Sequence, residues 1–314
     1  MFTRIFCFTL LWFTFLITSG RAEIELELLG QAILPTGLMY ENTEVGGLSG
    51  VSYAPEEGVY YVISDDRSLR QPARFYRLAI NIQDNLVNNN SVEITGVTLL
   101  QDKGGALFKA GSVDPEGIAV TENGELFISS EGVTKKLIPP SIVLYSSAGK
   151  QLKRMMVPES FLPASDGSRG VRDNMGFESL TLSSNSRFLT TASENALIQD
   201  GPQATFTHRS PSRLIIFDTE RGEVVNEYIY LTDPVPELPV MPGALHVNGL
   251  VELLTLGESG EYLALERAYS EGKGFNIRLY RTVVENKENA CQPVCNRISC
   301  AFRVVFETLY YTIC

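Results

Sequence analysis

Acidic side chains recur at a regular interval along this chain. Asp65, Glu131, Glu194 and Glu266 each follow a short strand-like segment, and successive members are 66, 63 and 72 residues apart. Carboxylates that share a semi-enclosed space without compensation repel one another and raise one another's pKa. A hard cation such as Ca²⁺, which takes six to eight oxygen ligands, removes that repulsion. The recurrence therefore predicts a site for Ca²⁺ or another divalent cation, if the fold brings these acids together.

Two sets of residues are candidates for this chemistry. Those predicted to bind the cation are Asp65, Asp66, Glu116, Glu178 and Glu252. Those predicted to act in catalysis are Glu131, Glu194, Glu266, Arg67, Arg172 and Arg267. In a functional interpretation, the cation polarises an ester or phosphoryl oxygen and activates water, while the arginines neutralise the anion. In a structural interpretation, acid–arginine pairs only join neighbouring parts of the fold, and the spacing leaves both open.

Other kinds of chemistry have little support in the sequence. The chain has only two histidines, which nearly removes histidine-rich zinc sites and weakens any Ser-His-Asp triad. Residues 47–50 read Gly-Leu-Ser-Gly rather than G-x-S-x-G, so this segment is no nucleophile elbow. A formal net charge of −11 excludes nucleic acid as the main partner, because phosphate backbones attract basic patches.

The segments that carry the acids follow one repeated plan. Each has a Gly-rich or acidic start, a short strand, a turn, a second strand that ends in Ser or Thr plus an acid, and a further strand. The four repeats start near Gly46, Asp114, Gly176 and Gly249. A repeated unit of antiparallel strands is typical of a propeller blade, since one blade alone cannot bury both faces.

The sequence therefore predicts an all-β protein, a β-propeller with about four recognisable blades of three to four antiparallel strands and an incomplete or open ring. In such a ring the recurring acids would surround the mouth of a central channel. The period exceeds the 40 to 50 residues of common blades, which predicts insertions at residues 81–112 and 150–175. An ordinary two-sheet sandwich is the alternative.

The two ends of the chain differ from the repeats. Residues 1–22 have a basic Arg4, an apolar run over residues 5–17 and a Gly-Arg-Ala ending, which predicts a signal peptide cleaved near Ala22. No later apolar run is long enough to span a bilayer. We expect a periplasmic or secreted monomer without a membrane span after signal removal. Residues 23–283 form the expected propeller domain, and residues 284–314 form a divergent tail that contains four of the five cysteines.

Several of these segments together resemble a known family. They are residues 63–67 (Ile-Ser-Asp-Asp-Arg), 114–119 (Asp-Pro-Glu-Gly-Ile-Ala), 170–180 (Gly-Val-Arg-Asp-Asn-Met-Gly-Phe-Glu-Ser-Leu), 194–197 (Glu-Asn-Ala-Leu) and 265–269 (Leu-Glu-Arg-Ala-Tyr). In this order they resemble the phytase-like family, described as "esterase-like activity of phytase", whose members are exported β-propellers. The resemblance covers roughly residues 44–283, and from about Val284 the chain departs from the family pattern as a truncated or divergent end.

The resemblance implies a hydrolase that acts on small-molecule esters or phosphate esters, with a divalent cation, in the periplasm or outside the cell. It supplies no catalytic residues, so the site residues above come from the repeat alone. A non-catalytic propeller that binds a ligand or a protein partner at the channel mouth is the alternative. A panel of esters assayed with and without a chelator separates the two.

Overall fold

A computed structural model describes residues 26–257 and 260–284 of the chain. These residues form short antiparallel strands and three 3₁₀ turns, with no α-helix in the part described. The strands are β1 (Met39–Tyr40), β2 (Thr43–Glu44), β3 (Leu48–Ala54), β4 (Val59–Ser64), β5 (Arg74–Ile80), β6 (Val92–Leu99), β7 (Pro115–Val120), β8 (Leu126–Ser130), β9 (Ser141–Tyr145), β10 (Gln151–Arg154), β11 (Thr181–Leu182), β12 (Phe188–Ala192), β13 (Ser210–Asp218), β14 (Glu223–Thr232), β15 (His246–Thr255), β16 (Glu261–Ser270) and β17 (Gly274–Val283).

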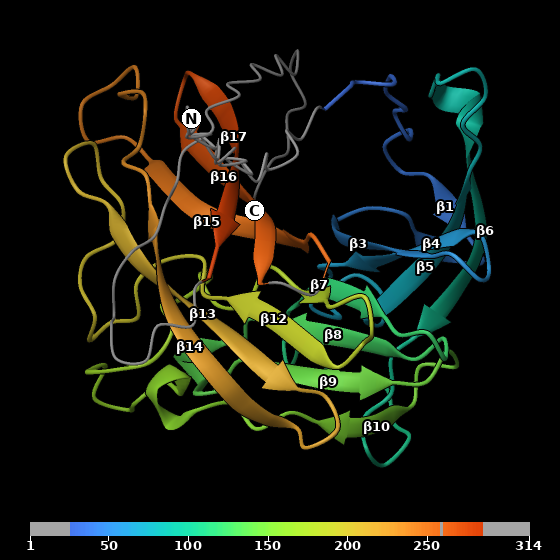
Figure 1. Ribbon diagram of the computed structural model, residues 1–314, viewed down its shortest axis with the longest axis horizontal. Helices are drawn as coiled ribbons and strands as arrows, with labels where there is room; N and C mark the ends of the chain where they lie inside the picture. Colours follow the sequence, from blue (N-terminus) through green and yellow to red (C-terminus); the bar gives the residue numbers. More distant parts are fainter. Residues whose placement is uncertain (1–25, 258–259, 285–314) are drawn as a thin grey trace, which may run out of the picture.

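Apart from the small β1–β2 hairpin, the strands form four sheets that follow one another along the chain (Figure 1). Blade 1 has the strand order β3-β4-β5-β6, blade 2 β7-β8-β9-β10, blade 3 β11-β12-β13-β14 and blade 4 β15-β16-β17. The first strand of each blade is innermost, and neighbouring inner strands contact one another from β3 to β7, from β7 to β11 and from β11 to β15. This arrangement is a four-blade β-propeller.

The sequence makes these strands through alternation and tight turns. In β16, buried and less buried residues alternate along nearly the whole strand, as expected when the two faces of a sheet have different environments. The β7–β8 hairpin turns at Gly124, whose φ of +75° is in the left-handed region that glycine adopts without a steric cost. The Gly124 N–H donates to the carbonyl of Thr121 at 3.0 Å and closes the turn.

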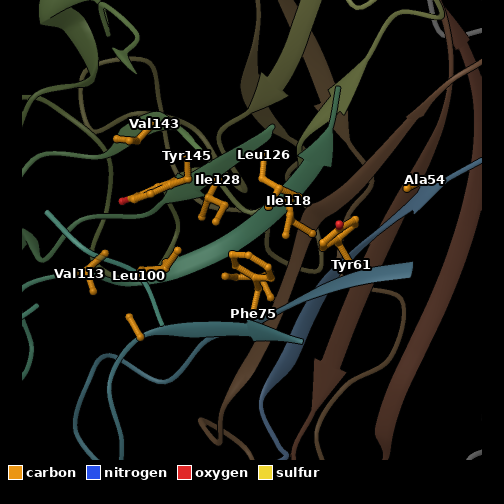
Figure 2. Close-up of a cluster of buried hydrophobic side chains, with 12 residues drawn as sticks. Ala54, Tyr61, Phe75, Leu100, Val113, Ile118, Leu126, Ile128, Val143 and Tyr145 are labelled. Atoms are coloured by element: carbon orange, nitrogen blue, oxygen red, sulfur yellow. The ribbon is translucent and has the colours of Figure 1, made fainter. Parts of the chain in front are cut away.

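The blades are held together by apolar clusters between them. The cluster between blades 1 and 2, shown in Figure 2, includes Phe75 of β5 and Tyr61 of β4 packed against Ile118 of β7 and Leu126 and Ile128 of β8. Corresponding clusters lie between blades 2 and 3 and between blades 3 and 4. Each large apolar side chain buried in this way stabilises the fold by roughly 1.5–3 kcal/mol, so the packing between blades fixes the positions of the inner strands.

The predicted fold class, an all-β propeller with about four blades of three to four antiparallel strands, is confirmed. The predicted insertions at residues 81–112 and 150–175 are wrong in part, because they contain β6 and β10, the outermost strands of blades 1 and 2. These strands look polar in sequence since their outer sides face solvent. The predicted signal peptide and almost all of the predicted divergent tail lie outside the described residues. Within the described part, no helix has the length and apolar character needed to cross a membrane.

Candidate functional site

The second strand of each blade ends beside the start of the first strand, at one end of the channel. In blades 1 to 3 an acid stands at this point, and its backbone N–H donates to a carbonyl at the start of the same blade. These hydrogen bonds join Asp65 to Gly47 at 2.7 Å, Glu131 to Asp114 at 3.0 Å, and Glu194 to Gly176 at 2.9 Å. The repeated backbone pairing therefore places three acids at equivalent positions around the axis, as the recurrence predicted.

Blade 4 has an arginine at this position. Leu250 pairs with Glu266 in the register in which Leu48 pairs with Ser64 and Pro115 with Ser130. Glu266 is thus equivalent to the serines of the other blades, and the next residue, Arg267, is equivalent to the acids. The sequence repeat, which aligned Glu266 with the acids, is out of register by one residue. Because side chains alternate between faces, this shift moves Glu266 to the opposite face of the blade.

Five carboxylates converge at the channel end and form what we call the acidic centre: Asp114, Glu116, Glu131, Glu178 and Glu194. They make two groups of three, in each of which one oxygen per residue lies within 4.8 Å of the others. One group is Asp114, Glu116 and Glu131, all from blade 2; the other is Glu131, Glu178 and Glu194, from blades 2 and 3. Glu131 belongs to both groups.

Glu131 is enclosed within this arrangement. Its side chain is buried, with the residue 2% exposed. Oε1 accepts a hydrogen bond from the backbone N–H of Gly176 at 2.7 Å, which ties blade 2 to blade 3. Oε2 is buried and has no hydrogen-bond partner among the described residues. A buried carboxylate oxygen without a partner is costly, so this atom indicates a missing ligand within the acidic centre.

The surroundings of the acidic centre raise the pKa of every carboxyl in it. Burial is the main cause in each case, because it penalises the charged form. It raises the pKa of Asp114 to about 6, although Arg67 acts in the opposite direction. It raises the pKa of Glu178 to about 7, against the opposing charge of Arg267. The pKa values of Glu116, Glu131 and Glu194 are raised well above the ordinary value by burial and by the neighbouring carboxylates.

Two arginines border the acidic centre. Arg67 donates through Nε to Asp114 at 2.7 Å and through Nη2 to Asn174. The Nη2 atom of Arg267 lies 3.4 Å from both carboxylate oxygens of Glu178. The Arg267 side chain is 46% exposed, so part of it faces solvent. The arrangement thus has buried carboxylates inside and a solvent-facing guanidinium at its border.

Glycines make room for the acids at the blade boundaries. A Cβ added to Gly249 of blade 4 would lie 2.3 Å from the Oε1 atom of Glu194, and one added to Gly176 would lie 2.8 Å from the backbone of Glu131. Real Cβ atoms do not approach other atoms so closely. The glycine at the start of blades 3 and 4 therefore lets the acid of the preceding blade reach the centre.

Asp65 and Glu252, both predicted metal ligands, lie near the acidic centre but in neither group of three. The residue Asp65 is exposed as a whole, but its carboxyl group is partly buried, which raises its pKa, and the charge of Arg67 opposes this rise. The carboxylate of Glu252 accepts a hydrogen bond from the backbone N–H of Leu253 at 2.9 Å. Burial raises the pKa of Glu252 to about 7, and Glu178 adds to this effect.

The structure places Asp66 and Arg172 outside the acidic centre, in structural contacts. The Asp66 carboxylate accepts hydrogen bonds from three successive backbone N–H groups, those of residues 69–71, and from Arg74. These bonds hold the pKa of Asp66 below its usual value in spite of burial. Arg172 donates to the backbone carbonyls of Ala196 and Gly201 and fastens that loop. Both side chains are thus held in contacts outside the centre.

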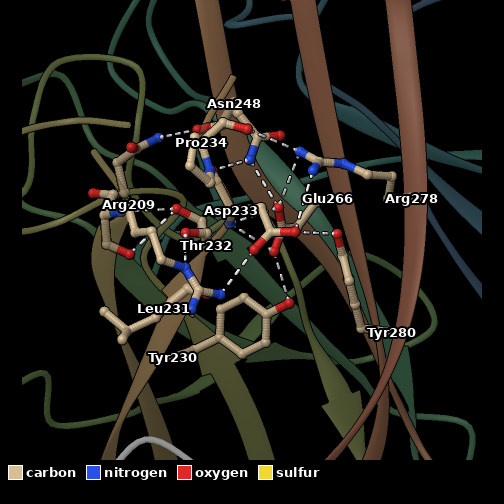
Figure 3. Close-up of polar contacts among 12 residues, drawn as sticks. Arg209, Tyr230, Leu231, Thr232, Asp233, Pro234, Asn248, Glu266, Arg278 and Tyr280 are labelled. Atoms are coloured by element: carbon tan, nitrogen blue, oxygen red, sulfur yellow. Dashed lines mark hydrogen bonds and ion pairs between the residues drawn. The ribbon is translucent and has the colours of Figure 1, made fainter. Parts of the chain in front are cut away.

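Glu266 also lies elsewhere, in a buried polar network between blades 3 and 4 (Figure 3). It is 1% exposed and accepts hydrogen bonds from the Tyr230 hydroxyl at 2.9 Å and from Asn248 Nδ2 at 2.8 Å. Arg278 spans the carboxylates of Glu266 and Asp233, with nitrogen–oxygen distances of 3.4 and 3.3 Å. With these partners, Glu266 connects blades 3 and 4 and does not belong to the acidic centre.

Asp114 was not among the predicted site residues, because the sequence marked it only as the start of the second repeat. Asp114 directly precedes β7 and Glu116 lies two residues further on, and one carboxylate oxygen of each lies within 4.8 Å of the other. That spacing is the signal that could have added Asp114 to the candidates. Of the predicted residues, the structure brings together Glu116, Glu131, Glu178 and Glu194, with Arg67 and Arg267 at the border.

The acidic centre fits a divalent cation. All of its donors are carboxylate oxygens, which hard cations such as Ca²⁺ and Mg²⁺ prefer. Calcium binds oxygens at 2.3–2.6 Å, so two oxygens on one ion lie at most about 5 Å apart, and the spread of 4.8 Å within each group is compatible with this. The buried, unpartnered Oε2 of Glu131 supplies a second and independent reason.

The phytase-like family model, described as "Esterase-like activity of phytase", matches residues 43–298. No curated protein matches the chain. Similar solved structures include the Dos1 propeller (TM-score 0.38, 8% identity, 76% of this chain and 56% of that chain). U3-55K is also similar (TM-score 0.36, 8% identity, 76% of this chain and 53% of that chain). So is the extracellular domain of the putative hybrid two component system BT4673 from B. thetaiotaomicron (TM-score 0.36, 10% identity, 83% of this chain and 24% of that chain). The chain thus covers about half or less of each of these structures.

Proposed function

The chain belongs to the phytase-like family, and from this premise we propose that it is an exported hydrolase of esters or phosphate esters that uses a divalent cation, Ca²⁺, at the acidic centre. The family name supports the ester chemistry. Export rests on the N-terminal sequence pattern, and the choice of Ca²⁺ rests on the all-oxygen donor set.

One observation carries the proposal: the unpartnered Oε2 of Glu131, buried beside Glu178 and Glu194. A purely structural cluster of acids would be expected to pair such a buried oxygen with a donor, as Glu266 does with Tyr230 and Asn248. A cation removes the cost of the unpaired oxygen and of the repulsion between the carboxylates. When bound, it would supply a Lewis acid for the ester or phosphoryl oxygen and activate water.

The residues at the border of the centre would orient the substrate. Arg267 contacts Glu178 at 3.4 Å and is partly exposed, so its other N–H groups can donate hydrogen bonds to the oxygens of an anionic ester. Arg67 is held by Asp114 and Asn174 and has a fixed direction. A guanidinium binds carboxylate or phosphate oxygens in a planar, bidentate manner. The two arginines would therefore place the scissile group over the carboxylates.

The experiment is a panel of phosphate and carboxylate esters, assayed with the purified chain in Ca²⁺ and in chelator. We expect turnover that depends on the cation and falls at least a hundredfold in Glu131→Gln. Glu223→Gln is the matched control, because Glu223 is an exposed glutamate at the start of β14, and it should keep full activity. Turnover that is unaffected by both chelator and Glu131→Gln would refute the proposal.

The alternative is a propeller that binds a ligand or a protein partner without catalysis. The same panel tests it, because that protein would turn over no ester while a bound ligand still raised its melting temperature by mass action.

A further inference from the structure

We propose that the acidic centre binds two divalent cations side by side, with Glu131 as the carboxylate that both of them share. This inference rests on the proposed metal site and goes beyond it by giving the number of ions and the ligands of each. The first ion would be held by Asp114, Glu116 and Glu131, and the second by Glu131, Glu178 and Glu194.

The positions of the oxygens support two sites rather than one. The five acids divide into two groups of three, and no group of four lies within the same 4.8 Å spread among the described residues. A single ion that bound all five acids would need them in one group. Glu194 occurs only in the second group, and Asp114 and Glu116 occur only in the first. Glu131 alone connects the two.

The fold places Glu131 at the boundary between the two groups. It ends the second strand of blade 2, while its Oε1 accepts the N–H of Gly176 at the start of blade 3. One oxygen is thus fixed against blade 3, and Oε2 is left buried without a partner. Carboxylates that bridge two ions about 3.5–4 Å apart are common in hydrolases with two metals. A bridge by Glu131 would use Oε2, the oxygen that has no other partner among the described residues.

The charges of the centre also favour a second ion. The five carboxylates, when ionised, face the two guanidinium groups of Arg67 and Arg267, which leaves an excess of three negative charges. One divalent cation cannot neutralise this excess. Two divalent cations neutralise the excess of these seven groups, and the carboxylates of Asp65 and Glu252 nearby add negative charge that further favours a second ion.

The test is the number of ions bound per chain, measured by equilibrium dialysis of the full chain against Ca²⁺ with elemental analysis. We expect two ions for the unchanged chain. Glu116→Gln removes a ligand of the first group only and Glu194→Gln one of the second group only, so each should keep one ion. Glu131→Gln should keep none with comparable affinity. Cooperative urea unfolding of each variant verifies that it is folded.

A single ion per unchanged chain would overturn the inference, and this measurement does not depend on any variant. Loss of all Ca²⁺ in both Glu116→Gln and Glu194→Gln would also overturn it, because it would indicate one shared site. The inference and the proposed function can fail separately. Two bound ions without turnover would refute the proposed hydrolase activity and support the pair of sites. Cation-dependent turnover with one bound ion would refute the pair of sites and support the hydrolase activity.

Discussion

Glu131→Gln should make the cation-free protein more stable, not less. In the absence of a cation, Oε2 of Glu131 is buried without a partner, and burial and the charges of Glu178 and Asp114 oppose ionisation of this side chain. Glutamine removes the charge while keeping the shape and an oxygen that can accept the Gly176 N–H. Its amide nitrogen can donate to Glu178 or Glu194, whose ligand oxygens lie within 4.8 Å. The substitution thus turns an unpaired acceptor into a donor among carboxylates.

The magnitude follows from the cost of an unsatisfied buried group. That cost is about 1–3 kcal/mol and larger for charged groups. At a pH high enough to ionise Glu131 in spite of its raised pKa, Glu131→Gln should therefore gain about 2 kcal/mol in chelator. For domains of 150–250 residues, 1 kcal/mol corresponds to roughly 2–4 °C in melting temperature, which makes the expected gain about 4–8 °C. In Ca²⁺ at a hundred times its Kd, the unchanged protein gains about 3 kcal/mol per bound ion. The order of stability should therefore reverse.

The assay is urea unfolding of both proteins in chelator and in Ca²⁺, followed by tyrosine fluorescence and far-UV circular dichroism. The reversal itself is the decisive result, because a general effect on packing would shift both conditions in the same direction. The reasoning is refuted if Glu131→Gln is the less stable protein in chelator, or if its response to Ca²⁺ equals that of the unchanged chain.

Three further outcomes follow from the structure. The pKa of Glu178 is raised to about 7 in the fold, so between pH 5 and 7 the folded, cation-free protein holds a proton that the unfolded chain has lost. Its free energy of unfolding should therefore decrease as pH rises through this range. A free energy of unfolding in urea and chelator that stays constant from pH 5 to 8 would contradict this. Gly249→Ala should weaken Ca²⁺ binding at least tenfold in calorimetry, since the new Cβ would lie 2.3 Å from Glu194 Oε1, whereas Gly46→Ala, with no atom within 4 Å of its Cβ, should bind normally. Glu266→Ala should cost about 3–5 kcal/mol of stability, as expected when one partner of a buried ion pair is removed, and should leave the number of bound Ca²⁺ ions unchanged; loss of an ion would return Glu266 to the metal site.

The blades and part of the acidic centre could be predicted from the sequence because they depend on local features. A strand, a tight turn and a second strand fix the pairing of Glu131 with Asp114 and of Glu194 with Gly176. Repetition of this local unit is visible in the sequence. The outermost strands β6 and β10 were less visible, since one side of each faces solvent and their composition resembles that of loops.

The fourth blade could not be aligned correctly because it has an acid, Glu266, at the position where blades 1 and 2 have a serine. The adjacent Glu266 and Arg267 offer two alignments that the sequence alone does not separate. The partners of Glu266 come from strands that are distant in sequence, such as Tyr230 of β14 and Arg278 of β17. Only the packing of blade 3 against blade 4 shows that this acid belongs to a separate network.

The arginine of blade 4 also gives the channel mouth a direction. A ring of four identical units would present the same side chain four times, and a ligand could then bind in four equivalent orientations. Here Asp65, Glu131 and Glu194 are followed by Arg267 at the equivalent register position. The backbone therefore repeats regularly around the axis, but the charges do not, because blade 4 has a positive side chain where blades 1 to 3 have negative ones. A ligand that carries both charges would have one preferred orientation, which is the condition for acting on one bond of a molecule that has several similar ones.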